Sequence, residues 1–306
     1  MKKSILYLFL FFAIGSCINE DDEPKEPCID AEVPCPVIIG QENEGCVANI
    51  IFLAEGFTDP EMTEFMELCE VAKQAILDME PFASANSLNF YRVNSISCTS
   101  GIKTKEFTST CSQNNVVNTS STTAWSVFGN RVGIQHYVGM EPSKRDLMEY
   151  LYGNYATGDY VYTIIIANTT AYYGGAEFPG VTEHNTIINP KVSNMIVSKY
   201  DSGDQFKYLI RHEFGHSFGN LDDEYESENT DCAIRNYEPW YLPQEPKLNV
   251  LTYNPNNWFE GARYVSTGYW REWENSIMRG DATSTTFSPK QREIVNQRLS
   301  DAIGCP

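Results

Sequence analysis

The stretch from His212 to His216 reads HEFGH, and this HExxH pattern constrains the chain more than any other feature. Residues four apart lie one turn apart on the same face of a helix, so His212 and His216 can offer two imidazoles to one metal ion. Glu213 stands beside the first histidine, where it can serve as a general base. A catalytic zinc site uses three protein ligands and leaves one position open, so we expect a third ligand elsewhere.

The flanking residues support a metal site, which matters because three fixed letters in five recur by chance. Apolar residues at helical spacing in 206–210 lead into the motif. Gly219 follows three residues after His216, where a helix ends and the chain turns back. The acidic run 222–224 comes next and offers a carboxylate as the third ligand.

The segment HEFGHSFGNLDDEY, residues 212–225, resembles the signature of the bacterial IgA-specific metallopeptidase family. That family resembles the metzincins, whose pattern HExxHxxGxx(H/D) would place the third metal ligand at Asp222. In the IgA-peptidase pattern the steady element is Asp-Glu-Tyr, which places this ligand at Asp223 instead. The residues alone leave both carboxylates open, and we take Asp223 on the strength of the resemblance.

Two further stretches extend the resemblance beyond the histidine motif. Residues 274–280 are similar to a metzincin Met-turn, in which a methionine lies beneath the metal as hydrophobic support, and Met278 takes that place. Metzincins often carry a tyrosine two residues later, which is a partner of the transition state. This chain has Gly280 at that position, and Tyr225 is a hypothetical substitute for the missing tyrosine. AEGFT at 54–58, followed by a helix, is also similar to the IgA-peptidase family. The resemblance implies a zincin-like or metzincin-like catalytic domain that hydrolyses peptide bonds with Zn²⁺ as cofactor.

Strands and helices alternate ahead of the motif. Short apolar runs predict buried strands, and helical spacing after capping residues predicts helices. We expect strands in residues 37–40, 47–54, 88–97 and 160–167, and helices that begin near residues 58, 142 and 288. Residues 99–123 are predicted to form a long loop and 226–270 an aromatic, loop-rich insert. This order indicates an α/β (α+β mixed) fold, a mixed twisted sheet with packed helices.

The pair Gly174-Gly175 follows the clearest buried strand. In zinc peptidases of this build an edge strand lies over the cleft, and glycines there would let a substrate backbone approach closely. An ordinary glycine turn is the alternative. The two other histidines, His136 and His184, are interpreted as surface residues.

The N-terminus has the form of a bacterial export signal. Lys2 and Lys3 precede an apolar run, residues 4–14, that is too short for an ordinary membrane span. The following Ile-Gly-Ser-Cys ends at Cys17 and resembles a lipobox, which implies cleavage before Cys17 and attachment of a lipid to it. A plain signal peptide with an incidental cysteine is the alternative.

These features predict three regions: a lipoprotein signal peptide in 1–16, a tether in 17–36 and a zinc metallopeptidase domain in 37–306. An acidic run directly after Cys17 resembles the surface-export signals of some outer-membrane lipoproteins, and an ordinary solvated tether would look the same. We expect an exported lipoprotein of the outer membrane, displayed on the cell surface.

The cysteine count and the net charge indicate whether the chain forms disulfides and which partners it can bind. Eight of the nine cysteines lie beyond Cys17, and an even set in an exported protein predicts disulfides, with free buried thiols as the alternative for some. The net charge of −19 argues against nucleic acid as a partner, because phosphate binding needs clustered Lys and Arg. We expect a monomer.

Together these features predict a lipid-anchored, exported zinc metalloendopeptidase with Glu213 as its catalytic base. Its expected substrates are host or environmental proteins and glycoproteins, immunoglobulin A-like ones among them. The alternative is a surface lipoprotein that keeps the metallopeptidase fold and binds peptides or glycans. The complete HExxH motif, with its glutamate, argues against that alternative.

Overall fold

The computed structural model of this protein describes residues 36–43, 47–84, 88–107, 114–118, 127–132, 135–140, 160–176, 192–200, 203–226, 246–280 and 283–303. The predicted signal peptide, almost all of the tether with Cys17, the helix expected near residue 142 and His184 lie outside these ranges.

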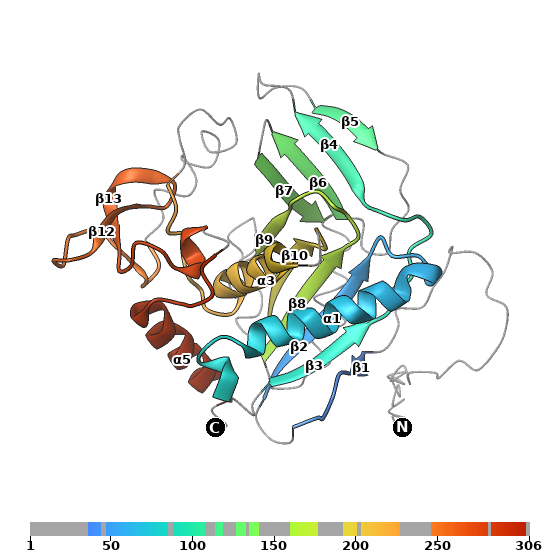
Figure 1. Ribbon diagram of the computed structural model, residues 1–306, viewed down its shortest axis with the longest axis horizontal. Coiled ribbons are helices and arrows are strands. Elements are labelled where there is room, and N and C mark those ends of the chain that lie inside the picture. The colour runs from blue at the N-terminus through green and yellow to red at the C-terminus, as the bar shows by residue number, and fades with distance from the viewer. Residues whose placement is uncertain are drawn as a thin grey trace, which may run out of the picture.

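Strands and helices follow one another along the described chain (Figure 1). The strands are β1 (Val37–Ile38), β2 (Ala48–Glu55), β3 (Leu88–Val93), β4 (Lys103–Phe107), β5 (Asn114–Asn118), β6 (Val127–Val132), β7 (Gln135–Met140), β8 (Tyr160–Ala167), β9 (Gly174–Ala176), β10 (Val192–Ser198), β11 (Val250–Leu251), β12 (Phe259–Ala262) and β13 (Val265–Arg271). The helices are α1 (Met62–Leu77), α3 (Asp204–Ser217) and α5 (Pro289–Ile303), with short 3₁₀ turns η1 (Asp59–Glu61), η2 (Phe82–Ser84) and η3 (Ile277–Arg279).

A six-stranded mixed sheet with the order β1-β3-β2-β8-β10-β9 forms the centre of the molecule. β2 pairs in parallel with both β3 and β8, and β10 pairs in parallel with β8. β1 and β9 are antiparallel to their neighbours and close the two edges. The predicted α/β (α+β mixed) class, with helices packed on a mixed sheet, is confirmed.

β2 is buried on both faces, which explains the apolar run Ile50 to Ala54 at its centre. Ile50 and Phe52 face the side of the sheet that carries the helices, in one core with residues of α1, α3 and α5. Ile51 and Leu53, which alternate with them, belong to a second cluster on the opposite face. Figure 1 shows α1 and α3 lying across the same face of this sheet.

Helix α3 is held against the sheet by an aromatic cluster. The Phe214 ring meets the Phe82 ring edge-on at 5.3 Å and the Tyr162 ring of β8 at 6.2 Å. Phe218, just past the helix end, stacks on Phe214 at 5.1 Å. Each fully buried side chain of this size contributes about 1.5–3 kcal/mol through apolar burial. The cluster therefore fixes the helix that carries both motif histidines.

Two regions predicted as loops contain strands. Residues 99–123 hold β4 and β5, which join β6 and β7 in a four-stranded sheet, and residues 226–270 hold a three-stranded sheet of β11, β13 and β12. Both predictions were wrong because these strands carry polar or exposed side chains, as in KTKEF and NNVVN. Backbone pairing orders such strands without the apolar pattern that sequence analysis detects.

Cys69 is a free thiol buried in α1. Burial raises the pKa of this thiol well above its ordinary value, so it behaves as an inert core residue. The expectation that the cysteines form disulfides is therefore wrong for Cys69. Cys98 is exposed, and the other cysteines beyond Cys17 lie outside the described ranges.

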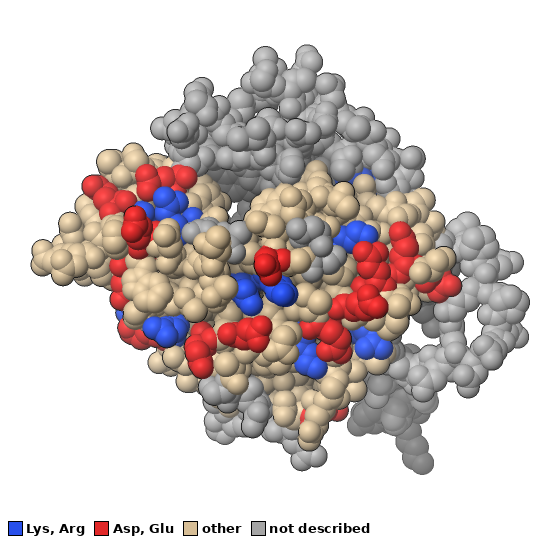
Figure 2. All heavy atoms as spheres, viewed as in Figure 1, with Lys and Arg blue, Asp and Glu red and all other residues tan. Residues whose placement is uncertain are grey.

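Acidic and basic side chains are interspersed on the face that Figure 2 shows. Lys199 Nζ lies 2.8 Å from Glu64, and an Arg211 nitrogen lies 3.7 Å from Asp78. The acidic member of each pair is exposed, and surface pairs of this kind contribute about 1 kcal/mol or less, so they are not what holds the fold together. Within the described ranges, no helix combines the length and the hydropathy that a bilayer crossing requires.

The end of α3 is tightly packed. Asn220, with φ 55°, adopts the left-handed conformation, and its N–H donates to His216 O at 3.0 Å while that of Leu221 donates to Gly215 O at 3.2 Å. A Cβ on Gly219 would lie 2.6 Å from Gly215 O and 3.0 Å from Val295. Gly219 thus marks the turn, as predicted, but for lack of space and not for a positive φ.

We predict that Gly219→Ala lowers the free energy of unfolding by about 1–3 kcal/mol, because the added methyl meets a backbone oxygen that cannot move aside. Urea unfolding measures this difference. Lys207→Ala, at an exposed position of the same helix, is the control and should change stability by less than about 0.5 kcal/mol. Equal unfolding midpoints for Gly219→Ala and wild type would contradict the packing argument.

Candidate metal centre

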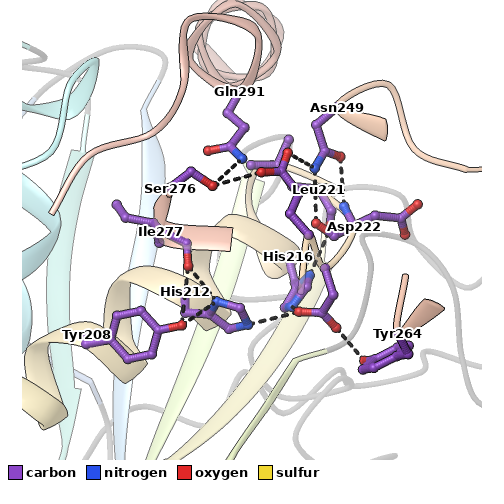
Figure 3. A network of polar contacts seen from close by, with 12 residues as sticks. Tyr208, His212, His216, Leu221, Asp222, Asn249, Tyr264, Ser276, Ile277 and Gln291 are labelled. Atoms are coloured by element: carbon purple, nitrogen blue, oxygen red, sulfur yellow. Dashed lines mark hydrogen bonds and ion pairs between the residues drawn. The ribbon is translucent and has the colours of Figure 1, made fainter. Parts of the chain in front are cut away.

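The two motif histidines are buried on one face of α3, with 6% and 7% of their surface exposed. Each Nδ1 is held by a backbone carbonyl: His212 Nδ1 lies 2.9 Å from Ile277 O and His216 Nδ1 lies 2.6 Å from Leu221 O. Figure 3 shows the contacts of both rings with these carbonyls. The Tyr208 hydroxyl, one turn earlier on α3, also lies 3.1 Å from His212 Nδ1.

These carbonyl contacts decide which ring nitrogen is free. A carbonyl oxygen only accepts, so Nδ1 of each ring carries the hydrogen and donates it. In a neutral imidazole Nε2 then keeps its lone pair, which is the arrangement that metal-binding histidines use. The chain thus presents two Nε2 lone pairs.

Asp223 completes the cluster, because its Oδ1 lies 3.1 Å from Nε2 of both His212 and His216. The ligand atoms of these three buried residues all lie within 4.8 Å of one another. Two nitrogen lone pairs and a carboxylate oxygen repel one another unless a positive charge lies between them. Their convergence therefore requires a proton or a metal ion.

The spacing suits a small divalent ion. Nitrogen and oxygen ligands about 2.0–2.2 Å from a tetrahedral ion lie roughly 3.3–3.6 Å from one another, close to the 3.1 Å found here. Two imidazoles with one carboxylate are also a ligand set that zinc accepts at catalytic sites. His212, His216 and Asp223 therefore fit a metal ion.

The pKa shifts of the cluster show its attraction for positive charge. Burial lowers the pKa of His216, but the Asp223 carboxylate outweighs this effect and raises that pKa to about 9. Burial likewise raises the pKa of Asp223, while His216 and the hydrogen bonds from both imidazoles bring it below its ordinary value. The pair thus holds a cationic charge strongly, and a metal ion can take the place of the proton.

Asp222 lies apart from the histidines. Its Oδ2 accepts from the Lys247 N–H at 2.7 Å and lies 3.3 Å from Arg263 Nε. Its backbone N–H donates to Asn249 Oδ1 at 2.9 Å. Figure 3 shows the Asp222 side chain directed away from both rings. Of the two carboxylates that the sequence left open, the structure brings only Asp223 to the histidines.

Glu213 is 6% exposed, and its carboxylate lies against strand β9. A Cβ on Gly174 would overlap with Glu213 Oε1 and lie 2.9 Å from Leu209 Cδ2, so any larger residue would displace this carboxylate from its position. Burial raises the pKa of Glu213; the two imidazoles lower it and Asp223 raises it further. β9 pairs with β10 and, among the described strands, ends the sheet.

Met278 is fully buried in η3, with its sulfur packed against Gly215 of the histidine motif. Its carbonyl accepts the Glu224 N–H at 2.8 Å, which ties this turn to the loop that carries Asp223. Gly280, with φ 87°, then turns the chain beside the Tyr225 ring. That ring lies 6.2 Å from the His212 ring, centre to centre.

A buried polar network that sequence analysis did not find joins four segments of the chain. Glu224, fully buried, accepts from Asn249 Nδ2 at 3.0 Å and from the Ser276 hydroxyl at 2.8 Å. Gln291 of α5 donates to Ser276 Oγ at 3.0 Å. Burial raises the pKa of Glu224 and these hydrogen bonds lower it. The network holds the Asp223 loop to the Met278 turn and to α5 (Figure 3).

Sequence analysis also missed two tyrosines at the site. Tyr208 was detectable in principle, because it precedes His212 by four residues on one helix face. Tyr264, whose hydroxyl donates to Asp223 Oδ2, lies 41 residues from its partner and has no sequence signal. The side chain of His136, in β7, lies outside the described part of the structure.

Residues 44–258, more than half of the chain, match the family model described as IgA Peptidase M64. No curated protein matches the chain.

We predict that Asp223→Asn and Asp222→Asn fail in different ways. Asp223→Asn removes the charge that faces both Nε2 atoms and should abolish tight zinc binding, measured by competition with a chelator. Asp222→Asn should keep zinc affinity and lose up to about 3–5 kcal/mol of unfolding free energy, because it leaves Arg263 buried beside a neutral amide. Loss of zinc affinity in Asp222→Asn, with zinc affinity retained in Asp223→Asn, would contradict the geometry.

Proposed function

Since the chain belongs to the IgA Peptidase M64 family, a metallopeptidase family, we propose that it is a zinc-dependent endopeptidase. The observation that carries this proposal is the convergence of His212 Nε2, His216 Nε2 and Asp223 Oδ1, with a buried glutamate next to the first histidine. A bound zinc ion supplies Lewis-acid polarisation of the scissile carbonyl and lowers the pKa of the attacking water.

Glu213 is the proposed general base. It takes a proton from the attacking water at a carboxylate oxygen and passes this proton to the nitrogen of the leaving amine. Its raised pKa supports this role, because a carboxylate with a higher pKa is a stronger base. The burial of Glu213 also limits competing hydrogen bonds from bulk water.

β9 is the proposed docking strand for the substrate backbone. It forms the end of the described six-stranded sheet, and its Gly174 lies against the Glu213 carboxylate. A peptide that adds as a further strand beside β9 would pass next to the catalytic base. Gly174 lets the Glu213 carboxylate lie against the strand, and Gly175 adds no side chain that would block the substrate backbone.

The proposed substrates are proteins or glycoproteins outside the cell, immunoglobulin A-like ones among them. The family description supports the immunoglobulin class, and the N-terminal pattern supports an extracellular setting. The same pattern underlies the proposal that cleavage before Cys17 and a lipid on this residue hold the enzyme at the outer membrane, on the cell surface.

Glu213→Gln tests the catalytic proposal. We expect the variant to bind zinc as tightly as wild type and to hydrolyse a broad peptide library about 10²- to 10⁴-fold more slowly, because the amide cannot take up the proton. Glu64→Gln, at a surface position of α1, is the control and should keep full activity. A chelator should abolish wild-type hydrolysis and added zinc restore it. Undiminished hydrolysis by Glu213→Gln would refute the assigned role.

Cys17→Ala tests the anchor. In bacteria that express the full chain, we expect wild type to incorporate labelled fatty acid and to sediment with membranes, and the variant to do neither. Cys28→Ala, which alters the next cysteine along the chain, is the control and should behave as wild type. Labelling of the Cys17→Ala variant would show that the lipid, if any, is attached elsewhere.

A further inference from the structure

A two-residue turn joins β12 to β13 in an unusual backbone conformation. Ala262 pairs with Val265, and the residues between them, Arg263 and Tyr264, have φ of 53° and 70°. Two successive positive φ values form the type I′ hairpin turn, which favours Asn, Asp and Gly. A bulky residue such as tyrosine rarely adopts this conformation, so the surrounding structure must hold it there.

The turn docks on the loop that carries Asp223. The Arg263 N–H donates to Asp223 O and the Tyr264 N–H donates to Tyr225 O, each at 3.0 Å. The Arg263 guanidinium, 3.3 Å from Asp222, also lies 5.0 Å from the centre of the Tyr269 ring. Both residues of the turn therefore bind the loop through their backbone, and Arg263 also binds it through its side chain.

Tyr264 reaches the metal cluster itself. Its hydroxyl donates to Asp223 Oδ2, while Oδ1 of the same carboxylate lies 3.1 Å from both histidine Nε2 atoms. Oδ2 thus accepts the Tyr264 hydroxyl, and Oδ1 faces the two histidines (Figure 3). The Tyr264 ring packs edge-on against Tyr225 at 4.9 Å, which fixes the direction of the hydroxyl.

We propose that Tyr264 is a positioning residue that directs Asp223 to bind the metal ion through Oδ1 alone. This inference rests on the proposed function, because it presumes a metal ion between His212, His216 and Asp223. The hydroxyl donates to Oδ2, so a turn of the carboxylate that offered both oxygens to the ion would break this hydrogen bond. The strained turn orients the Tyr264 hydroxyl toward Asp223, and the contact of Arg263 with Asp222 stabilises the turn.

The hydroxyl also fixes the orientation of the Asp223 carboxylate before a metal ion binds. Without it, Asp223 can rotate about its last side-chain bond, and ion binding must then restrict that rotation. Groups that orient a ligand in this way contribute roughly 10- to 100-fold to metal affinity. Loss of the hydroxyl should therefore weaken zinc binding while leaving the three ligands in place.

Tyr264→Phe in the full chain tests the inference, since it keeps the ring on Tyr225 and removes one oxygen. We expect zinc affinity, measured by competition with a chromogenic chelator, to fall roughly 10- to 100-fold. The visible absorption of the cobalt-substituted variant should also shift, because the ligand oxygens change. Thermal unfolding in excess chelator should remain cooperative, which shows that the variant is folded when its zinc affinity is measured.

Tyr253→Phe is the matched control, because it removes a phenol hydroxyl from the same part of the chain at an exposed position. It should keep wild-type zinc affinity and the wild-type cobalt spectrum. If Tyr264→Phe is recovered unfolded, Tyr264→Gly repeats the test, because glycine favours the positive φ of this turn, and the same loss of zinc affinity is expected.

The outcomes separate this inference from the proposed function. Wild type that binds zinc, with a Tyr264→Phe variant of equal affinity and unchanged cobalt spectrum, overturns the role of Tyr264 alone. Wild type that binds no zinc overturns both. Weaker zinc binding and a shifted spectrum in Tyr264→Phe, with the control unchanged, support the inference.

Discussion

The site depends on the mutual repulsion of three electron-pair donors that the fold forces together. Backbone carbonyls of Ile277 and Leu221 orient the imidazoles of His212 and His216 so that both Nε2 lone pairs face Asp223 Oδ1. Such an arrangement is unfavourable without a positive charge at its centre. The surrounding structure must therefore hold the donors in place, and a bound cation would reverse the sign of their interaction.

Three structural units bear on the loop that carries Asp223. The turn at the end of α3 brings the loop back to the histidines. Hydrogen bonds of Glu224 join the loop to Asn249 and to Ser276, which precedes the Met278 turn. The β12–β13 hairpin contacts the loop through Tyr264. Each unit comes from a different part of the sequence. The geometry of the metal cluster thus depends on packing across the whole C-terminal half of the described chain, and not on the motif helix alone.

The parts of the fold with strong apolar patterns were predictable from the sequence. β2 and β8 are mainly apolar and buried on both sides. The predicted helix starts are also close, because the capping box at Thr58 begins η1, which leads into α1, and Ser288 caps α5. β4 and β5 were missed because their residues are polar, and the β12–β13 hairpin because its turn lacks the usual glycine or asparagine. Asp222 and Asp223 are neighbours in the sequence, so their spacing from the histidines could not decide which of them is the third ligand. The choice between them depends on how Arg263 and Lys247 hold Asp222, which only tertiary structure shows.

The most direct test of the account is a crystal structure of the zinc-loaded protein, with anomalous scattering recorded on both sides of the zinc absorption edge. The account predicts one strong peak that appears only above the edge, bonded to His212 Nε2, His216 Nε2 and Asp223 Oδ1, with the Tyr264 hydroxyl on Asp223 Oδ2. A peak bonded to Asp222, or no peak at the histidines, would contradict it.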